Sequence, residues 1–306
     1  MTLTCLLHSL VQMNMVKDTQ SLKPVEVVFL TYLLGSALII LVFRTQLDVW
    51  IDQIVVRALA LFLVIGYTLM RQSRFISFFR IFTPFFFLSY FYAESALFHK
   101  LVFSDLLDQY FAGLDQYLFG WQPSIEFSKH FSATLFSELM FFGYFSYYVL
   151  IIGLPVYIYW VINKEIGERF AFIIVNSLLI YYVIFSLFPV AGPQFYFNND
   201  LIQVPAGYVF EPVIRLIQGM AERPTGAFPS SHVSICLMLV WGCMKYARKW
   251  IYLVVPTAVL LILSTVYIGA HYVVDVLGGI LFTPVIYWFS GWLYDLLSRH
   301  HFKLTK

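Results

Sequence analysis

Long apolar runs separated by short polar stretches make up most of this chain. The runs cover about residues 25–43, 54–70, 76–98, 133–160, 170–190, 231–246, 250–268 and 272–297. An α-helix rises about 1.5 Å per residue, so helices of these lengths cross or nearly cross the roughly 30 Å hydrocarbon core of a bilayer. The pattern therefore predicts an all-α fold, a polytopic membrane helical bundle of about eight spans.

The rest of the sequence agrees with a membrane protein. No serine- and glycine-rich linker or clear repeat interrupts the apolar pattern, so residues 1–306 are expected to form a single membrane domain. Hydrophobic residues make up 60% of the chain and charged residues 12%, whereas an average globular domain is about 45–50% apolar. The net charge of +2 says little about partners; the apolar composition makes the lipid bilayer the expected partner, and no nucleic acid is expected. The oligomeric state is left open.

Basic residues gather on one side of the predicted bundle. With eight spans, both termini share a side with the connections near residues 71–80, 161–169 and 245–249, and that side holds 13 of the 19 basic residues. Cytoplasmic segments of membrane proteins are enriched in lysine and arginine. We therefore expect a multi-pass protein of the cell membrane, with both termini in the cytoplasm. The two histidine clusters described below fall on the opposite face, so the active site is expected to be extracytoplasmic.

Two stretches outside the spans are longer than ordinary connections. Residues 99–132 mix acidic and aromatic residues, as expected for amphipathic segments that lie at the lipid surface. Residues 191–230 are rich in proline, glycine and aromatic residues and lead directly to His232. Long structured loops are often functional.

One histidine cluster opens the last apolar run. His271 and Asp275 are spaced i, i+4, so their side chains are expected on one face of a helix. The carboxylate can then hold one ring nitrogen, which leaves the lone pair of the other free and stabilises the cation that forms when it reacts. This spacing indicates an oriented nucleophile.

The other cluster lies one helical hairpin earlier. Ser230, Ser231 and His232 open the run at 231–246, and hydroxyls beside the free N–H groups of a helix N-terminus form a site for anions. The hairpin returns His232 and His271 to the same membrane face, and Arg223 precedes them closely. Ionisable residues in membrane spans are functional by default, so the two clusters together indicate phosphate chemistry. No metal or cofactor is expected, since the cysteines form no ligand cluster.

Three stretches resemble, in order and spacing, the signature motifs of the type 2 phosphatidic acid phosphatase superfamily: Arg223-Pro224, Pro229-Ser230-Ser231-His232, and Ser264-Thr265-Val266-Tyr267 followed by Gly269, His271 and Asp275. The motif region spans residues 186–280. The resemblance implies a six-helix catalytic core, here with extra helices, and metal-independent hydrolysis of a phosphorylated lipid through phosphohistidine. It implies His271 as nucleophile, Asp275 as its partner and His232 as general acid. Arg223 and Ser230 are then phosphate ligands, with Ser231 and Arg215 as further candidates.

Three positions depart from the family pattern. Leu216 stands where the first motif usually has lysine, with Arg215 beside it as a candidate substitute, and Ser231 stands where glycine is usual. Thr265 replaces the arginine of the last motif. That loss is shared by the branch resembling inositolphosphorylceramide synthase, as are segments like 188–193 and 226–230. Those enzymes move a phospho-headgroup between lipids, so the acceptor is a lipid alcohol in place of water.

Other functions stay open at this stage. A lipid phosphatase is favoured because that activity is broad in the superfamily, and a headgroup phosphotransferase of the inositolphosphorylceramide synthase type is the alternative. A second alternative is an inactive phospholipid-binding or transport protein, although transporters usually hold polar groups at the midplane. Glu138 is a candidate for a headgroup pocket or a structural carboxylate. Tyr267 is a candidate for the same pocket or for packing.

Overall fold

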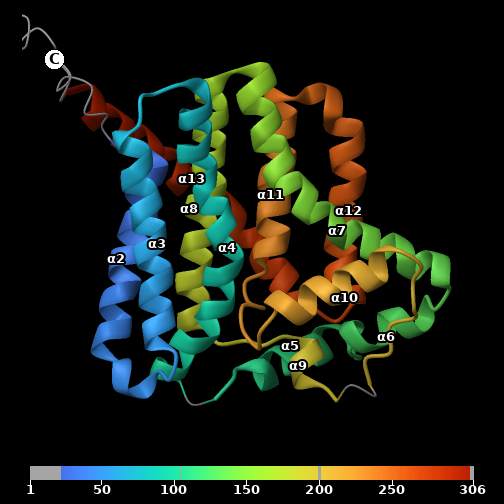
Figure 1. Ribbon diagram of the computed structural model, residues 1–306. Helices are drawn as coiled ribbons and strands as arrows, with labels where there is room; N and C mark the ends of the chain where they lie inside the picture. The colour runs from blue at the N-terminus through green and yellow to red at the C-terminus, as the bar shows by residue number, and fades with distance from the viewer. Residues whose placement is uncertain (1–21, 104, 199–200, 304–306) are drawn as a thin grey trace, which may run out of the picture.

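The computed structural model describes residues 22–103, 105–198 and 201–303, and within them every regular element is a helix (Figure 1). The helices are α2 (Pro24–Val42), η1 (Arg44–Gln46), α3 (Trp50–Leu69), α4 (Arg74–Val102), α5 (Asp108–Phe119), α6 (Pro123–His130), α7 (Thr134–Tyr157), η2 (Ile158–Ile162), α8 (Lys164–Leu187), α9 (Pro193–Tyr196), α10 (Phe210–Ala221), α11 (Ser231–Tyr246), η3 (Arg248–Trp250), α12 (Ile251–Tyr267) and α13 (Val273–Lys303). The all-α prediction is confirmed.

Each of the eight predicted apolar runs forms a helix, and within the described residues seven helices are long and apolar enough to cross a membrane. The exception is α11, which has 16 residues. At about 1.5 Å per residue such a helix is about 24 Å long, short of the roughly 30 Å hydrocarbon core. The chain before it is buried from Thr225 to Ala227, so α11 begins inside the bundle. His232 lies in the first turn of this helix.

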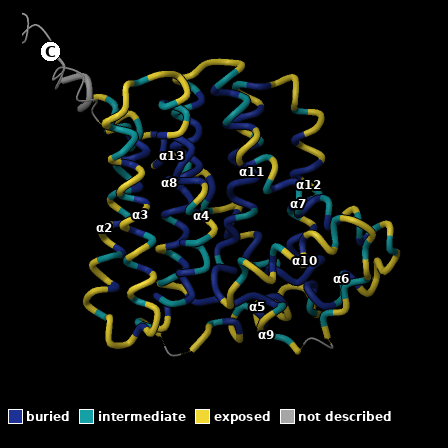
Figure 2. The backbone as a smooth tube through the Cα atoms, viewed as in Figure 1, coloured by how far each residue is buried: buried dark blue, intermediate teal, exposed yellow. Residues whose placement is uncertain are grey.

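The bundle is centred on α8, which packs against α2, α4, α7, α11 and α13. Of its most apolar window 72% is buried, against 22% for the peripheral α3. Figure 2 shows the contrast as a dark blue α8 beside the largely yellow and teal α2 and α3. Because lipid supplies no hydrogen-bond partners, the backbone groups of these helices are satisfied within each helix.

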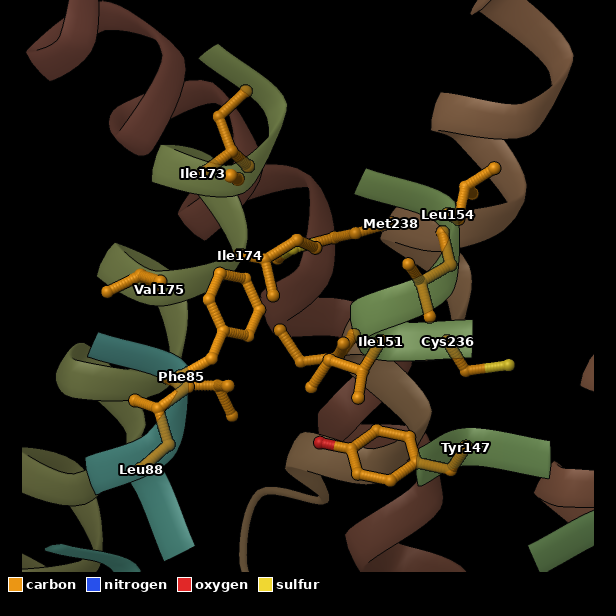
Figure 3. Close-up of a cluster of buried hydrophobic side chains, with 14 of the residues drawn as sticks. Phe85, Leu88, Tyr147, Ile151, Leu154, Ile173, Ile174, Val175, Cys236 and Met238 are labelled. Atoms are coloured by element: carbon orange, nitrogen blue, oxygen red, sulfur yellow. The ribbon is translucent and has the colours of Figure 1, made fainter. Parts of the chain in front are cut away.

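The core between the central helices is apolar and aromatic. Figure 3 shows Phe85 and Leu88 of α4 facing Tyr147 and Ile151 of α7, and α8 and α11 contribute further side chains of the cluster, such as Met238. Several of these side chains also line the cavity described below.

Two buried ion pairs fasten the peripheral helices to α4. Arg57 of α3 contacts Glu94 of α4 at 2.6 Å, and Arg80 of α4 contacts Glu26 of α2 at 2.6 Å. All four side chains are almost completely buried. In a low-dielectric interior, each charge requires its partner.

The two ends of the bundle differ. At one end Lys23 pairs with Glu168 at 3.0 Å and Arg169 with Asp295 at 3.2 Å. Contacts therefore join the starts of α2 and α8 to the C-terminal part of α13, as the predicted alternation of spans requires. The outermost residues of both termini, 1–21 and 304–306, lie outside the described residues. At the opposite end α5, α6, α9 and α10 gather across the ends of the long helices (Figure 1).

The segment 99–132 is more than a surface layer. Tyr110 and Tyr117 of α5 are exposed, as expected for an amphipathic helix, but Asp108 and Asp115 on its other face are 0% exposed. Both carboxylates face the bundle and bind its loops. The sequence prediction missed this inward face.

Candidate active site

The structure brings His232 and His271 together at the end of the bundle that carries α5, α6, α9 and α10. Nδ1 of His232 lies 3.4 Å from Nε2 of His271. His232 is in the first turn of α11, and His271 lies in the turn that joins α12 to α13. The Ser230 hydroxyl caps α11 by accepting a hydrogen bond from the Val233 N–H at 3.3 Å, and the Ser230 N–H donates to the Asp275 carbonyl at 3.0 Å. The two histidine segments are thus tied to each other through backbone.

The outer nitrogen of His271 has a fixed partner. Nδ1 lies 2.9 Å from the Ala227 carbonyl oxygen and 3.5 Å from Oδ2 of Asp275. A carbonyl oxygen only accepts, so Nδ1 carries the hydrogen and Nε2 keeps its lone pair. Nε2 thus has a lone pair that faces Nδ1 of His232, as the predicted role of nucleophile requires.

The prediction that His271 and Asp275 share one helical face was wrong. α13 begins at Val273, so His271 lies before the helix and does not share a helical face with Asp275. The turn still brings the two side chains together, because Oδ2 of Asp275 accepts the Tyr272 N–H at 2.8 Å and fixes the residue next to His271. The Ala227 carbonyl, which orients the ring most closely, carries no side-chain signal in the sequence.

His232 has partners that the sequence did not indicate. Its Nε2 lies 3.2 Å from the Tyr144 hydroxyl, which donates to Oε1 of Glu222 at 3.1 Å. The rings of Tyr144 and Tyr147 lie against the imidazole, with centroids 5.1 and 4.6 Å away. Tyrosines at helical spacing in an apolar run read as core residues. The sequence offered one indication of these partners, the position of Glu222 directly before the motif residue Arg223, and the sequence prediction did not use it.

A cavity of about 270 Å³ adjoins His232 between α4 and α7. Its inner part is apolar and includes Phe85, Leu88 and Ile151, which face one another in Figure 3. Its other part is polar and ends at Glu222, Ser231 and His232, with tyrosine side chains between the two parts. The cavity therefore has an amphipathic lining.

The predicted phosphate ligands divide into two groups. Ser231 lines the cavity, and Ser230 is buried next to it at the start of α11. Arg223 is exposed at the rim, where its Nη1 donates to the Glu222 carbonyl at 2.7 Å. Arg215 lies elsewhere: it pairs with Glu211 one turn away on α10 at 3.1 Å and stacks over Phe141. The guanidinium of Arg215 is engaged there and does not line the cavity beside His232.

Glu138 and Tyr267 do not form a headgroup pocket with the histidines. The Glu138 carboxylate accepts the N–H groups of residues 208–210 at 2.8 to 2.9 Å and so caps the start of α10. The Tyr267 hydroxyl donates to the Phe131 carbonyl at 2.9 Å. Neither residue lines the cavity beside His232 in the described part of the chain. Both residues bind backbone at the end of the bundle, which fits the structural role that was the alternative for each.

Thr265 confirms that the site is poor in cations at this position. Its hydroxyl donates to the Ile262 carbonyl of its own helix at 2.8 Å. Its carbonyl accepts the His271 N–H at 3.0 Å. The residue thus supports the turn that carries His271 through its backbone, and it supplies no charge to a bound phosphate.

The inward face of α5 clamps the turns around His271. Asp108 accepts the N–H groups of Ala191 and Gly192, each at 2.8 Å. Asp115 accepts those of Val273 and Val274 at 2.9 and 3.0 Å. Burial raises the pKa of both carboxyl groups, while the amide N–H groups that donate to them favour the ionised form. Asp115 thus fixes the N-terminus of α13, two residues beyond His271, and Asp108 fixes the turn at residues 191–192.

Comparison with known proteins covers the same region. The model of a protein family described as the PAP2 superfamily matches residues 112–289, which include both histidines and Asp275. A PA-phosphatase related-family protein of Dictyostelium discoideum is 24% identical over 203 residues, 54% of this chain and 36% of the relative. The match thus spans about a third of that protein's length. No solved structure matches the chain.

Proposed function

The chain belongs to the PAP2 superfamily, and from this premise we propose that it is an integral membrane lipid phosphatase that works without metal through a phosphohistidine intermediate. The observation that carries the proposal is the histidine pair. The reacting nitrogens face each other at 3.4 Å, while the outer nitrogens are held by different partners, a carbonyl on His271 and a hydroxyl on His232. Different outer partners give the two rings different roles.

The reaction follows from those roles. Nε2 of His271 attacks phosphorus, and the bond from phosphorus to the leaving oxygen breaks. Nδ1–H of His232 gives its proton to that oxygen. In the second half, His232 takes a proton from water as the water oxygen bonds to phosphorus, the phosphorus–nitrogen bond breaks and phosphate leaves. Phosphoryl transfer depends chiefly on positioning and electrostatic stabilisation, for which Ser230, Ser231 and Arg223 are the proposed ligands.

The cavity supports a lipid as the substrate. Its apolar part lies between two membrane helices, and its polar part ends at His232. A phosphorylated lipid entering from the bilayer would bury its chain against Phe85, Leu88 and Ile151 and present its head to the histidines. A water-soluble phosphate ester has no chain to fill this apolar part.

The charge distribution supports an orientation in the cell membrane. Lysine and arginine predominate at the bundle end opposite the histidines, so that end is proposed to be cytoplasmic together with both termini. The histidine pair then faces the extracytoplasmic side. Substrate would reach it from the outer leaflet.

A second candidate is a headgroup phosphotransferase of the inositolphosphorylceramide synthase type. The observation in its favour is Thr265, which stands in place of a cationic phosphate ligand and turns its hydroxyl to its own helix. In that case a lipid alcohol, not water, gives its proton to His232 in the second half. An inactive lipid-binding protein has less support, because a binder needs no histidine with an oriented lone pair.

The test uses purified protein in detergent or vesicles with labelled phosphatidic acid, a polyprenyl diphosphate and phosphoinositides. Each substrate is given with and without a lipid alcohol, and products are separated into free phosphate and new phospholipid. Free phosphate supports the phosphatase, and a new phospholipid supports the transferase. Full activity in His271→Ala contradicts both. Activity that disappears with chelator and returns with metal contradicts the metal-free mechanism.

A further inference from the structure

An acidic side chain lies at the polar end of a cavity proposed to take phosphate. Glu222 ends α10 and lines the cavity with Ser231 and His232. A carboxylate repels phosphate, so its presence needs a reason other than substrate charge. The hydrogen bonds of the Glu222 carboxylate supply that reason.

Three elements hold the Glu222 carboxylate in place. The Gln194 side chain of α9 donates to Oε2, and the Gln218 amide, one turn back on α10, lies 3.2 Å from both oxygens. The Tyr144 hydroxyl of α7 donates to Oε1 at 3.1 Å. Side chains with donors on three sides are fixed in one rotamer, so Glu222 gives Tyr144 a permanent acceptor.

The single hydrogen of the Tyr144 hydroxyl decides the state of His232. Because that hydrogen goes to the carboxylate, the Tyr144 oxygen offers a lone pair to Nε2 of His232, 3.2 Å away. Nε2 therefore carries a hydrogen, and Nδ1 is the nitrogen that faces His271. The neutral ring has a lone pair at Nδ1, and the charged ring has the proton that a leaving oxygen requires.

Burial disfavours the charged form of His232, and the arrangement of the facing nitrogens opposes that effect. Nε2 of His271 has no hydrogen, since its Nδ1–H donates to the Ala227 carbonyl. Two lone pairs 3.4 Å apart repel, and one proton on Nδ1 of His232 turns the repulsion into a hydrogen bond. The negative charge of Glu222, relayed through the Tyr144 hydroxyl, stabilises the resulting cation.

We infer that Glu222, acting through Tyr144, is a positioning residue that aims Nδ1 of His232 at the leaving oxygen and stabilises its charged form. The inference rests on the proposed function. It gives His232 a counterpart to the Asp275 carboxylate beside His271. The groups that face His232 are Tyr144 and Tyr147 of α7 and His271 before α13, with Glu222 behind the first and Asp275 behind the last.

The experiment compares Glu222→Gln and Tyr144→Phe with wild type, measuring kcat and KM for phosphate release across pH. Glu126→Gln is the matched control, because the Glu126 carboxylate on α6 is partly exposed and pairs with Lys129. General acid–base catalysis contributes about 10²–10⁴-fold, so a weakened acid is expected to lower kcat by about 10- to 100-fold with KM little changed. The alkaline limb of the kcat profile moves to lower pH, since loss of the negative charge lets His232 release its proton more readily. The control keeps the wild-type profile.

Two outcomes separate this inference from the proposed function. If His271→Ala is inactive but Glu222→Gln and Tyr144→Phe keep the wild-type kcat and alkaline limb, the inference is wrong and the phosphatase stands. If His271→Ala keeps full activity, the proposed function fails first. Tyr144→Phe leaves both glutamine contacts of Glu222 intact, so it still decides the question if Glu222→Gln does not fold.

Discussion

Asp115→Asn is expected to loosen the turn that carries His271 without touching the histidine itself. The two oxygens of the Asp115 carboxylate accept separate hydrogen bonds from Val273 and Val274, at 2.9 and 3.0 Å. An asparagine side chain has a single acceptor oxygen, so one of these N–H groups would face an NH₂ donor. The charge at the N-terminus of α13 is lost as well.

The magnitude follows from these contacts. A hydrogen bond to a charged group contributes about 1.5–3 kcal/mol net, and a carboxylate at a helix N-terminus adds about 0.3–1 kcal/mol through the helix dipole. Together they predict that the free energy of unfolding of Asp115→Asn is lower than that of the wild type by about 2–4 kcal/mol. Since a misplacement of about 1 Å can lower a rate by about 10²-fold, kcat should fall as well, even at temperatures where the variant stays folded.

The assay is thermal unfolding in detergent together with kcat for phosphate release. Gln109→Ala is the matched control, because Gln109 lies on α5 and is exposed. The control is expected to behave like wild type. If Asp115→Asn has the Tm and kcat of the control, α5 is not a clamp on the site and the reasoning is wrong.

Two further predictions concern the bundle. Arg57→Met leaves Glu94 buried without its partner at 2.6 Å, so the free energy of unfolding should fall by about 3–5 kcal/mol in thermal unfolding. The double variant Arg57→Met with Glu94→Leu should regain most of that free energy. Equal stability of the single and double variants would contradict this explanation. Gly279→Ala would place a Cβ 2.6 Å from the Ser230 carbonyl oxygen, so the start of α11 must shift, at a cost of about 1–3 kcal/mol. Gly278 is unsuitable as a control because it also contacts the core, whereas Gly153→Ala meets open space and should unfold like wild type.

The spans were predictable because the bilayer imposes one strong requirement. A run of apolar residues long enough to cross it must be a helix, and each predicted run is one. The bounds predicted for α11, residues 231–246, are those of the structure, but the depth at which this helix begins was not predicted, because residues 225–230 are turn-rich in sequence yet are largely buried. Periodicity describes a helix but does not indicate how deep it begins.

Part of the site was also predictable from the sequence, and part was not. His232, His271, Asp275 and Ser231 lie together because motif spacing and a helical hairpin determine which residues meet. Asp108 and Asp115 were missed because an acidic residue on an amphipathic helix looks the same in sequence whether it faces water or a loop N–H.

The sequence also did not predict the partners that act through backbone atoms or from distant parts of the chain. The Ala227 carbonyl that orients His271 has no side-chain signature. Glu222 and Tyr144 meet across separate helices, and no local pattern links them. Arg215 was predicted as a phosphate ligand from its place beside Leu216, but an i, i+4 pair with Glu211 holds it on α10.

Trapping the covalent intermediate tests the mechanism most directly. The protein is mixed with a lipid carrying a labelled phosphate, quenched under alkaline conditions that preserve phosphohistidine, digested and sequenced by mass spectrometry. We predict label on His271 in the wild-type protein, more of it in His232→Ala if that variant still reacts slowly, and none in His271→Ala, with chelator present throughout. Turnover by His271→Ala, or label on another residue of the active wild-type protein, would contradict the mechanism.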